Sequence, residues 1–397
     1  MKILHLTTSK KGGAGLFTLD MVRHFNNSDH INDVYSFNDF LAKGFIRFSI
    51  VVFYNLFKTV LRVKFKKKNY SKHINPLLSI WRLTKIVDLV SKYDVVVIYR
   101  FTNFLSYTEL LKIIEASSKS YIIAVDESLF TPYCNYTFSC EQFKTGCHDC
   151  PIVKSKNKKR EIRVMYKNIY SILNDYDLSK FDVKILTANK EEKQKISQSF
   201  WGKSNIKIEP TIFPYELYLN DSEFEKIFNE KIGIFENEII ITISALAPTK
   251  RKGFDIFLNY LSKLASFCEQ NNRIVTLNVV TSEFLDINVK SNFLKIIQHG
   301  LMNKQEFEKL IASSHAFLSF SRTDSGPFTL NMCYYLRVLI YSFKVGVATE
   351  ISEQSDSIFM SDQFDSTSMM SMTQELFELD SITLKSLLSY KINNTWI

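Results

Sequence analysis

The sequence predicts an α/β protein made of two doubly wound domains. Three observations lead to this prediction. Short apolar runs alternate with helical or polar stretches, a glycine-rich segment directly follows the first run, and 397 residues exceed what one hydrophobic core usually holds. Because strands joined by crossover segments pair in parallel, each domain should be a parallel sheet with both faces covered.

The first domain opens with a strand at residues 2–7 and a helical pattern over residues 16–25, with the segment KGGAG between them. Glycine lets the backbone approach a ligand and leaves amide groups free at a helix N-terminus. Gly12, Gly13 and Gly15 are therefore candidate phosphate-binding residues. A plain tight turn is the alternative interpretation.

Further strands are expected in two series that are separated by a proline-containing stretch. The apolar runs lie at residues 95–99, 121–125, 183–187, 239–244, 274–280, 316–319 and 338–342. Pro210 and Pro214 stand between the third and fourth runs. We therefore divide the chain into domains at 1–206 and 207–397.

The net charge of +9 arises from one segment. Residues 40–87 contain eleven Lys and Arg but no Asp or Glu, so the rest of the chain sums to −2. On a helix, residues 45–68 would place basic side chains on one face and apolar ones over the remainder, which is typical of a helix lying in an anionic lipid interface. A buried helix with a solvated basic edge is the alternative. The sequence offers no module typical of nucleic-acid binding.

The expected cellular compartment determines whether the six cysteines are reduced or form disulfides. The sequence shows neither a secretory signal nor a run of ~18 apolar residues, so a cytoplasmic location is expected, with reduced cysteines. Four of the six cysteines lie in the loop at 131–151, namely Cys134, Cys140, Cys147 and Cys150. Four thiolates can hold one structural zinc ion, and His148 is a further candidate ligand. The alternative is a compact loop of reduced, buried cysteines.

A basic turn and an acidic turn mark the second domain. Arg251 and Lys252 stand where a strand should end and a helix begin, and two cations at such a helix N-terminus suit a diphosphate. A solvated basic turn is the alternative. The segment SRTDSGPFTLNM at residues 321–332 contains Asp324 and a Gly-Pro turn.

Four stretches together resemble bacterial sugar transferases of glycosyltransferase family 4. The stretch from Asp126 to Pro151 resembles the Cys-rich loop of one subgroup, and KGGAG resembles the phosphate-side loop of the family. Residues 251–255 (RKGFD) and 321–332 resemble two donor-domain motifs, the second being the acid-x7-acid signature. The resemblance covers roughly residues 1–375.

The resemblance implies the GT-B fold, in which two Rossmann-like domains face a cleft. It implies that Arg251 and Lys252, with the glycines of KGGAG, hold the donor diphosphate, and that Asp126 and Asp324 act as catalytic residues that orient sugar hydroxyls. The donor sugar and ribose would be bound by Gly326, Pro327, Phe328 and Asn331. It also implies retention of anomeric configuration without an obligatory metal.

The sequence departs from the family pattern at four places. Thr131, Pro132 and Tyr133 stand where the family has T-G-G. Val125 stands where the family often has His, and Met332 stands at the second acid, where a thioether is a weak acceptor. Glu350 is not equivalent to that acid, but the Asn331 amide could reach the ribose instead. Members usually finish with a long helix, whereas this chain stops soon after a helical stretch at 382–390.

These features predict a bacterial glycosyltransferase that moves a sugar from a nucleotide-sugar donor to a lipid-linked glycan acceptor. The product context would be O-antigen or capsule, at the inner face of the plasma membrane. Domain 1–206 would bind the acceptor and domain 207–397 the donor. Two alternatives stay open: a nucleotide-sugar epimerase of the same fold, and a catalytically impaired homologue that acts as a binding or scaffolding protein.

Overall fold

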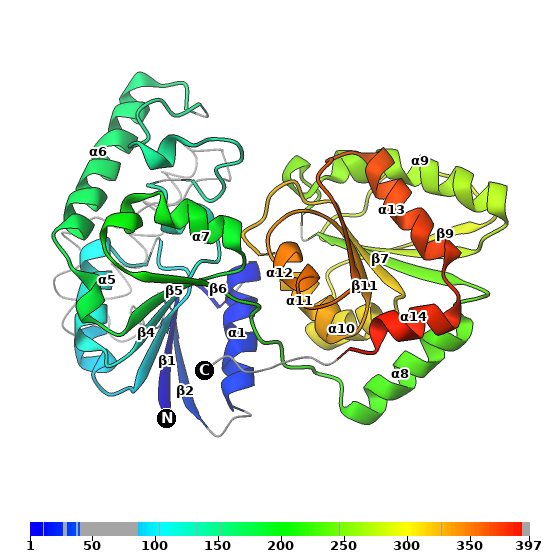
Figure 1. The fold of residues 1–397 in the computed structure, drawn as a ribbon, viewed down its shortest axis with the longest axis horizontal. Coiled ribbons are helices and arrows are strands. Elements are labelled where there is room, and N and C mark those ends of the chain that lie inside the picture. Colours follow the sequence, from blue (N-terminus) through cyan, green and yellow to red (C-terminus); the bar gives the residue numbers. More distant parts are fainter. Residues whose placement is uncertain are drawn as a thin grey trace, which may run out of the picture. The chain divides into compact units, whose positions relative to one another are not determined.

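The computed structural model describes residues 1–10, 12–26, 30–36, 39, 86–102, 104–132, 134–151, 153–245, 247–326 and 328–390. These fall into two compact units, Met1–Thr211 and Ile212–Ile397 (Figure 1). The sequence placed the division at residue 206. The predicted basic helix at 45–68, Pro327 and the last seven residues lie outside the described residues.

Unit 1 is a parallel sheet of six strands in the order β2-β1-β3-β4-β5-β6. The strands are β1 (Lys2–Thr7), β2 (Ile31–Ser36), β3 (Val95–Ile98), β4 (Ser120–Ile123), β5 (Val183–Thr187) and β6 (Lys207–Pro210). Strands β3 and β4 are buried at every residue, as expected for strands covered on both faces.

The helices of unit 1 begin at recognisable signals. The described ones of eight residues or more are α1 (Gly12–Asn26), α5 (Tyr107–Ala116), α6 (Lys156–Asn174) and α7 (Lys190–Ser197). Ser106 and Glu109 form a capping box at α5, and the Asn189 side chain caps α7. Helix α1 already begins at Gly12, so the glycines form its first turn rather than a loop before a helix that starts at Leu16.

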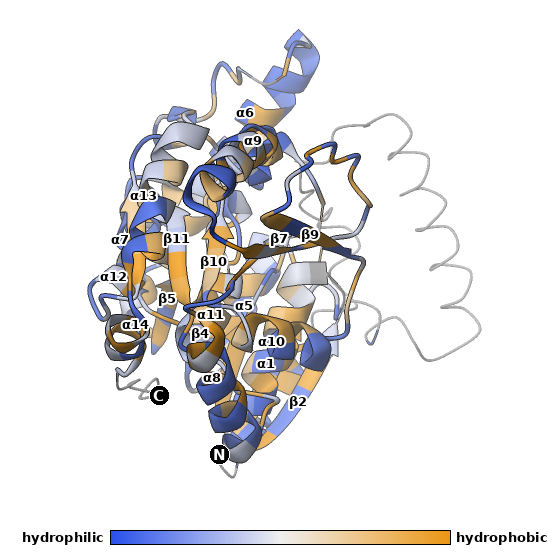
Figure 2. Cartoon of the chain, turned by 90° about the vertical axis from the view of Figure 1, so that its right-hand side faces the viewer, coloured by the Kyte–Doolittle hydropathy of each residue, from blue (hydrophilic) through white to orange (hydrophobic). Residues whose placement is uncertain are grey.

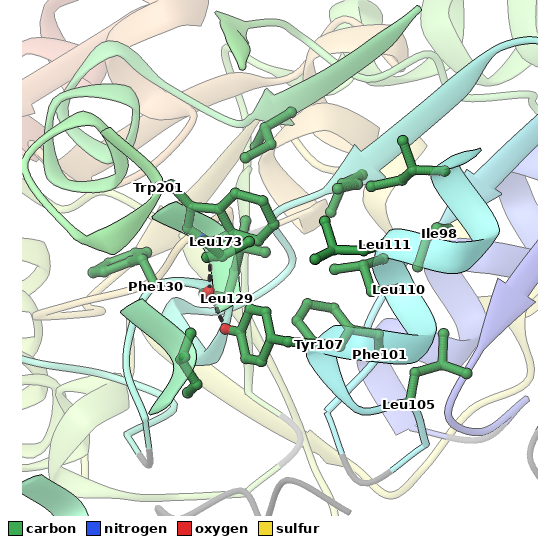
Figure 3. Packing of buried hydrophobic residues seen from close by; sticks show 14 of the residues in the cluster. Ile98, Phe101, Leu105, Tyr107, Leu110, Leu111, Leu129, Phe130, Leu173 and Trp201 are labelled. Carbon is green, nitrogen blue, oxygen red and sulfur yellow. Dashed lines mark hydrogen bonds between the residues drawn. The ribbon is translucent and has the colours of Figure 1, made fainter. Parts of the chain in front are cut away.

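The core of unit 1 holds the loop that follows β4. The Tyr107 hydroxyl and the Trp201 indole Nε1 both donate to the Leu129 carbonyl, each at 2.8 Å (Figure 3). Phe130 beside it is fully buried. This packing fixes the short 3-10 helix η2 (Glu127–Leu129), which directly follows Asp126.

Unit 2 repeats the architecture with a parallel sheet in the order β12-β11-β10-β7-β8-β9. Its strands are β7 (Ile239–Ala245), β8 (Val275–Thr281), β9 (Leu294–His299), β10 (Ala316–Ser319), β11 (Leu339–Phe343) and β12 (Ile358–Ser361). Its helices are α8 (Asp221–Ile234), α9 (Phe254–Asn271), α10 (Lys304–Ala312), α11 (Phe328–Tyr335), α12 (Ala348–Ser352), α13 (Ser366–Glu378) and α14 (Ser381–Leu388). The two sheets confirm the predicted α/β class with two doubly wound parallel sheets.

Candidate functional site

In unit 2 the predicted motifs meet at one point of the sheet. The chain runs from β7 outward through β8 to β9 and then returns to place β10 on the other side of β7. Residues 250–255 follow β7, and residues 320–328 follow β10. Ligands of open α/β sheets bind where the strand order reverses in this way, beyond the carboxyl ends of the strands.

A glycine brings the two loops into contact. The 3-10 helix η6 (Lys250–Lys252) ends at Gly253, whose φ is +69°. A Cβ atom on Gly253 would lie 1.9 Å from the Phe320 carbonyl oxygen. Only glycine therefore allows both this backbone conformation and the close approach of the basic turn to the end of β10.

Arg322 fastens the basic turn to the loop after β10. Its backbone N–H donates to the Arg251 carbonyl at 2.9 Å. Its guanidinium binds both oxygens of Asp255 in α9, with Nη1–Oδ1 at 2.6 Å and Nη2–Oδ2 at 2.7 Å. Hydrogen bonding from Arg322 lowers the pKa of Asp255. This bidentate pair holds the loops in register.

Asp324 gathers both predicted phosphate-binding cations. Its Oδ2 lies 3.3 Å from Arg251 Nη1 and forms a short ion pair with Lys252 Nζ. The Arg251 guanidinium also donates to the Thr323 carbonyl at 3.1 Å. Burial by itself would raise the pKa of Asp324, but the charges of Lys252 and Arg251 outweigh it and lower that pKa. Two cations therefore share this one carboxylate.

The Gly-Pro pair of the motif precedes α11 in the chain. Gly326 is buried, Phe328 opens α11, and Pro327 lies outside the described residues. The Phe328 ring makes an edge contact with Phe213 at a centroid distance of 5.9 Å. The N-terminus of α11 thus lies four residues after Asp324 in the chain, and the first amides of an α-helix have no partner within the helix itself.

Asn331 and Met332 are both buried in α11. The Asn331 amide Nδ2 donates to the Phe213 carbonyl at 3.2 Å, whereas its Oδ1 has no hydrogen-bond partner among the described residues. Met332 is 6% exposed. A buried amide oxygen without a donor is unusual, and it suits a ligand hydroxyl. Glu350 lies in α12.

Unit 1 has a reversal of strand order between β1 and β3. Beyond β1, a Cβ atom on Gly15 would lie 2.5 Å from the Ser9 carbonyl oxygen, so glycine lets residues 9 and 10 pass close to α1. Gly13 is exposed, with nothing within 4 Å of an added Cβ. Thr8 joins the ends of β1 and β3, because its hydroxyl donates to the Thr102 carbonyl at 3.0 Å.

Asp126 is held by one cation that the sequence analysis did not identify. Arg100 Nε lies 3.1 Å from Asp126 Oδ2, and the Ser128 N–H donates to Oδ1 at 3.0 Å. The Ser128 hydroxyl also donates to Oδ1. Arg100 stands two residues after β3. A basic residue so soon after a buried strand was the feature of the sequence that could have marked Arg100 as a site residue.

A second ion pair in unit 1 ties the loop to α7. Glu127 is 4% exposed, and its Oε1 lies 3.1 Å from Lys195 Nζ. The same carboxylate accepts from the Thr137 backbone N–H. Neighbouring acids at 126 and 127 are thus each matched by one cation from another part of unit 1.

The four cysteines of the loop lie together. Cys134, Cys140, Cys147 and Cys150 line one small cavity with Phe143. A hydrogen bond with the Cys150 thiol and burial raise the pKa of the Cys134 thiol, and burial raises that of Cys147 to about 12. Four thiols suit zinc chemically. In the described residues, however, no group of three or more His, Cys, Asp or Glu side chains is placed so that it could hold a metal ion.

Each of the two parallel sheets has a reversal of strand order, and the basic turn lies beyond one of them. The fold is that of the GT-B glycosyltransferases. A glycosyltransferase from Rickettsia africae matches over 98% of this chain and 93% of its own, with 14% identity and a TM-score of 0.53. Anabaena HepE in complex with UDP and glucose matches over 98% and 100%, with 14% identity and a TM-score of 0.50.

WaaG, a glycosyltransferase involved in lipopolysaccharide biosynthesis, matches over 97% of this chain and 92% of its own, with 10% identity and a TM-score of 0.50. At such low identity these likenesses establish the fold alone. No family model and no curated protein matches the sequence. None of the helices in the described ranges has both the length and the apolar character that a membrane span needs.

Proposed function

We propose that this protein is a retaining glycosyltransferase that transfers a sugar from a nucleotide-sugar donor to a lipid-linked glycan acceptor in bacterial surface-polysaccharide synthesis. The observation that carries the proposal is the cluster of Arg251, Lys252 and Asp324 beyond the reversal of strand order in unit 2. The GT-B fold supports it, since HepE binds UDP and glucose and WaaG acts in lipopolysaccharide biosynthesis.

In this proposal unit 2 neutralises the charge of the leaving diphosphate and positions the donor sugar. In the reaction, the bond between the anomeric carbon and the phosphate oxygen breaks, and the acceptor oxygen bonds to that carbon on the same face. The acceptor proton ends on the leaving diphosphate. Arg251 and Lys252 would neutralise the charge that develops there, while Asp324 would orient sugar hydroxyls.

The ribose of the donor would meet Asn331. Its Oδ1 is buried without a described hydrogen-bond donor, and a ribose hydroxyl would supply one. Met332, in the place of the second family acid, cannot accept hydroxyl protons with useful strength. The amide would therefore replace the missing carboxylate.

Unit 1 would bind the acceptor, with Asp126 held by Arg100 to orient an acceptor or donor hydroxyl. Gly12, Gly13 and Gly15 would present amides of the first turn of α1 to the diphosphate. The segment at 45–68 would lie against the anionic inner face of the plasma membrane, near lipid-linked substrate. The proposal includes no nucleic-acid partner.

The reaction needs no obligatory metal. A structural zinc ion on Cys134, Cys140, Cys147 and Cys150 is a separate part of the proposal, carried by the four thiols that line one cavity. Metal analysis of protein purified without chelators decides this. About one zinc per chain that disappears in Cys147→Ser would support it. Metal-free protein with unchanged folding would contradict it.

A transfer assay tests the proposal. Purified protein is incubated with labelled UDP- and GDP-sugars and a lipid extract of the producing bacterium, and the label is followed into the organic phase. Label in an extended glycolipid, lost in Asp324→Asn, supports the transferase. A free sugar isomer would indicate an epimerase instead.

A catalytically impaired homologue is the second candidate function. Met332 favours it, because a buried thioether stands at the place of a family acid. Calorimetry separates the two. A protein that binds neither UDP nor GDP has lost the donor site, and the binding or scaffolding role would then replace the enzymatic one.

A further inference from the structure

Helix α6 carries a line of cations along one face. Its buried side is formed by Ile162, Tyr166, Ile169 and Leu173. On the opposite side, exposed basic residues recur at intervals of four, three and four residues, which keeps them on one helical face. They are Lys156, Arg160, Arg163 and Lys167, here called the α6 stripe. The stripe extends over roughly 16 Å.

The acidic residues nearest in sequence are engaged with other lysines. Lys158 Nζ lies 2.6 Å from Glu161 Oε2, and Lys159 forms an ion pair with Asp149. Lys156, Arg160 and Lys167 form no ion pair with any acid in the described part of the chain, and Arg163 donates to the His148 carbonyl at 3.3 Å. The stripe therefore keeps a net positive charge.

Helix stability does not explain this arrangement. The first turn of α6 contains no acid, and Ser155 provides no capping hydrogen bond. In contrast, α5, α8 and α10 each begin with a capping box that contains glutamate. Cations near a helix N-terminus oppose the macrodipole, so the stripe weakens the helix that carries it.

Apolar side chains flank the stripe. Val164 is 48% exposed and Tyr170 is 37% exposed, both on the solvent side of α6. One end of α6 projects from the other helices of unit 1, and Figure 2 colours that end hydrophilic. A straight row of cations with an aromatic and an aliphatic side chain beside it fits a flat, anionic lipid surface, where such apolar groups enter the headgroup region.

We propose that the α6 stripe is a membrane-contact surface that binds anionic phospholipid headgroups. This inference rests on the proposed function and deepens it, because it gives the acceptor-binding unit a surface that would face the membrane carrying its substrate. It is independent of the segment at 45–68. Duplex nucleic acid would be attracted by the same charges, but it would gain nothing from exposed Val164 and Tyr170.

The test is co-sedimentation of the full chain with vesicles of mixed phosphatidylglycerol and phosphatidylcholine. The variant carries Lys156→Glu, Arg160→Glu and Lys167→Glu, and acids there should favour the helix. Each cation near an anionic surface strengthens binding roughly five-fold, so loss of three should weaken binding about 100-fold, and the repulsion of three glutamates should weaken it further. The matched control reverses three exposed lysines of unit 2, Lys290, Lys295 and Lys385, and should bind as the parent does.

The inference is overturned if the stripe variant binds vesicles as the parent does, or if the parent binds neutral and anionic vesicles equally well. It is also overturned if the stripe variant loses affinity for a DNA duplex but keeps its affinity for vesicles. A variant with Gln at the three positions should also bind anionic vesicles more weakly, which would show that charge is responsible.

UDP titration of the stripe variant separates failure of this inference from failure of the proposed function. Lost vesicle binding with unchanged nucleotide binding supports the inference, and an absence of nucleotide binding in all variants counts only against the proposed function.

Discussion

Beyond the ends of its strands, each unit holds a carboxylate whose side chain is 9% exposed, but the two units pair it with different cations. In unit 1, Asp126 meets one guanidinium, that of Arg100, and the donors of Ser128. In unit 2, Asp324 meets two cations, Arg251 and Lys252. The described ion pairs thus give the first carboxylate one cation and the second carboxylate two. Because paired cations suit an anionic group, the comparison supports the proposal that the cations of unit 2 bind the diphosphate.

The largest effect is expected from removing the carboxylate of unit 2. Asp324→Asn should lower transfer about 100-fold, because a sugar that is no longer oriented reacts rarely. The same change should tighten UDP binding about five-fold, since roughly 1 kcal/mol of charge repulsion is relieved. Asp126→Asn should lower transfer and leave UDP affinity unchanged. Transfer assays and calorimetry on both variants check this, and weaker UDP binding by Asp324→Asn would contradict the comparison.

The glycine between the motifs of unit 2 should matter for stability. Gly253→Ala should destabilise the protein by about 1–3 kcal/mol, because alanine is strained at positive φ and meets the Phe320 carbonyl. Gly233→Ala in α8 is the matched control, since nothing lies within 4 Å of its added Cβ. It should stabilise by about 0.5–1 kcal/mol. Urea denaturation measures both, and equal midpoints would refute the close approach.

Lys231 differs from Lys252, because it is buried without a carboxylate partner among the described residues, whereas Lys252 pairs with Asp324. Among the described residues, the hydrogen-bond acceptors of Lys231 are the Ser314 and Arg337 carbonyls, at 3.4 and 2.8 Å, and burial lowers its pKa to about 7. An unfolded lysine has a pKa of about 10.4, so between these values the unfolded chain binds a proton that the folded chain does not. Stability should therefore rise with pH over this window, by at most roughly 1.4 kcal/mol per unit.

The Lys231→Met protein should lose that pH-dependent rise. Denaturation of parent and variant at pH 7 and pH 10 measures the difference between the two slopes. Parallel slopes would show that the Lys231 ammonium keeps its proton in the folded protein.

The smallest effect concerns the ribose. Asn331→Ala should weaken UDP binding about five-fold, for the loss of one hydrogen bond of roughly 1 kcal/mol. Met332→Glu should then change little, because the amide already serves. If Met332→Glu instead tightens binding ten-fold and Asn331→Ala has no effect, the ribose position belongs to residue 332.

The sequence identified the inner strands of both sheets but not their edges. Predicted runs overlap every strand except β2, β6, β9 and β12, which are the four edge strands. Inner strands are buried on both faces and appear as continuous apolar runs, whereas β2 and β12 are mostly half-buried or exposed. Edge strands mix polar and apolar residues, so short-range pattern alone does not distinguish them from loops.

Some site residues were likewise predicted from the sequence, whereas others became evident only from the fold. Arg251, Lys252 and Asp324 were expected from their motifs, yet their shared ion pair links residues about seventy positions apart and depends on the pairing of β7 with β10. Arg100 carried no motif, so only the fold placed it at Asp126. The α6 stripe was overlooked because its charges cancel in the total for the chain outside 40–87, although its spacing was present in the sequence.

Calorimetric titration with UDP tests most directly whether unit 2 holds the diphosphate. Lys252→Ala should bind UDP about ten-fold or more weakly while remaining folded, because a charge-assisted contact is worth roughly 1.5–3 kcal/mol. Arg100→Ala, the corresponding cation of unit 1, should bind UDP as the parent does. Unchanged UDP affinity in Lys252→Ala would contradict the assignment, and a large loss in Arg100→Ala would point to unit 1 instead.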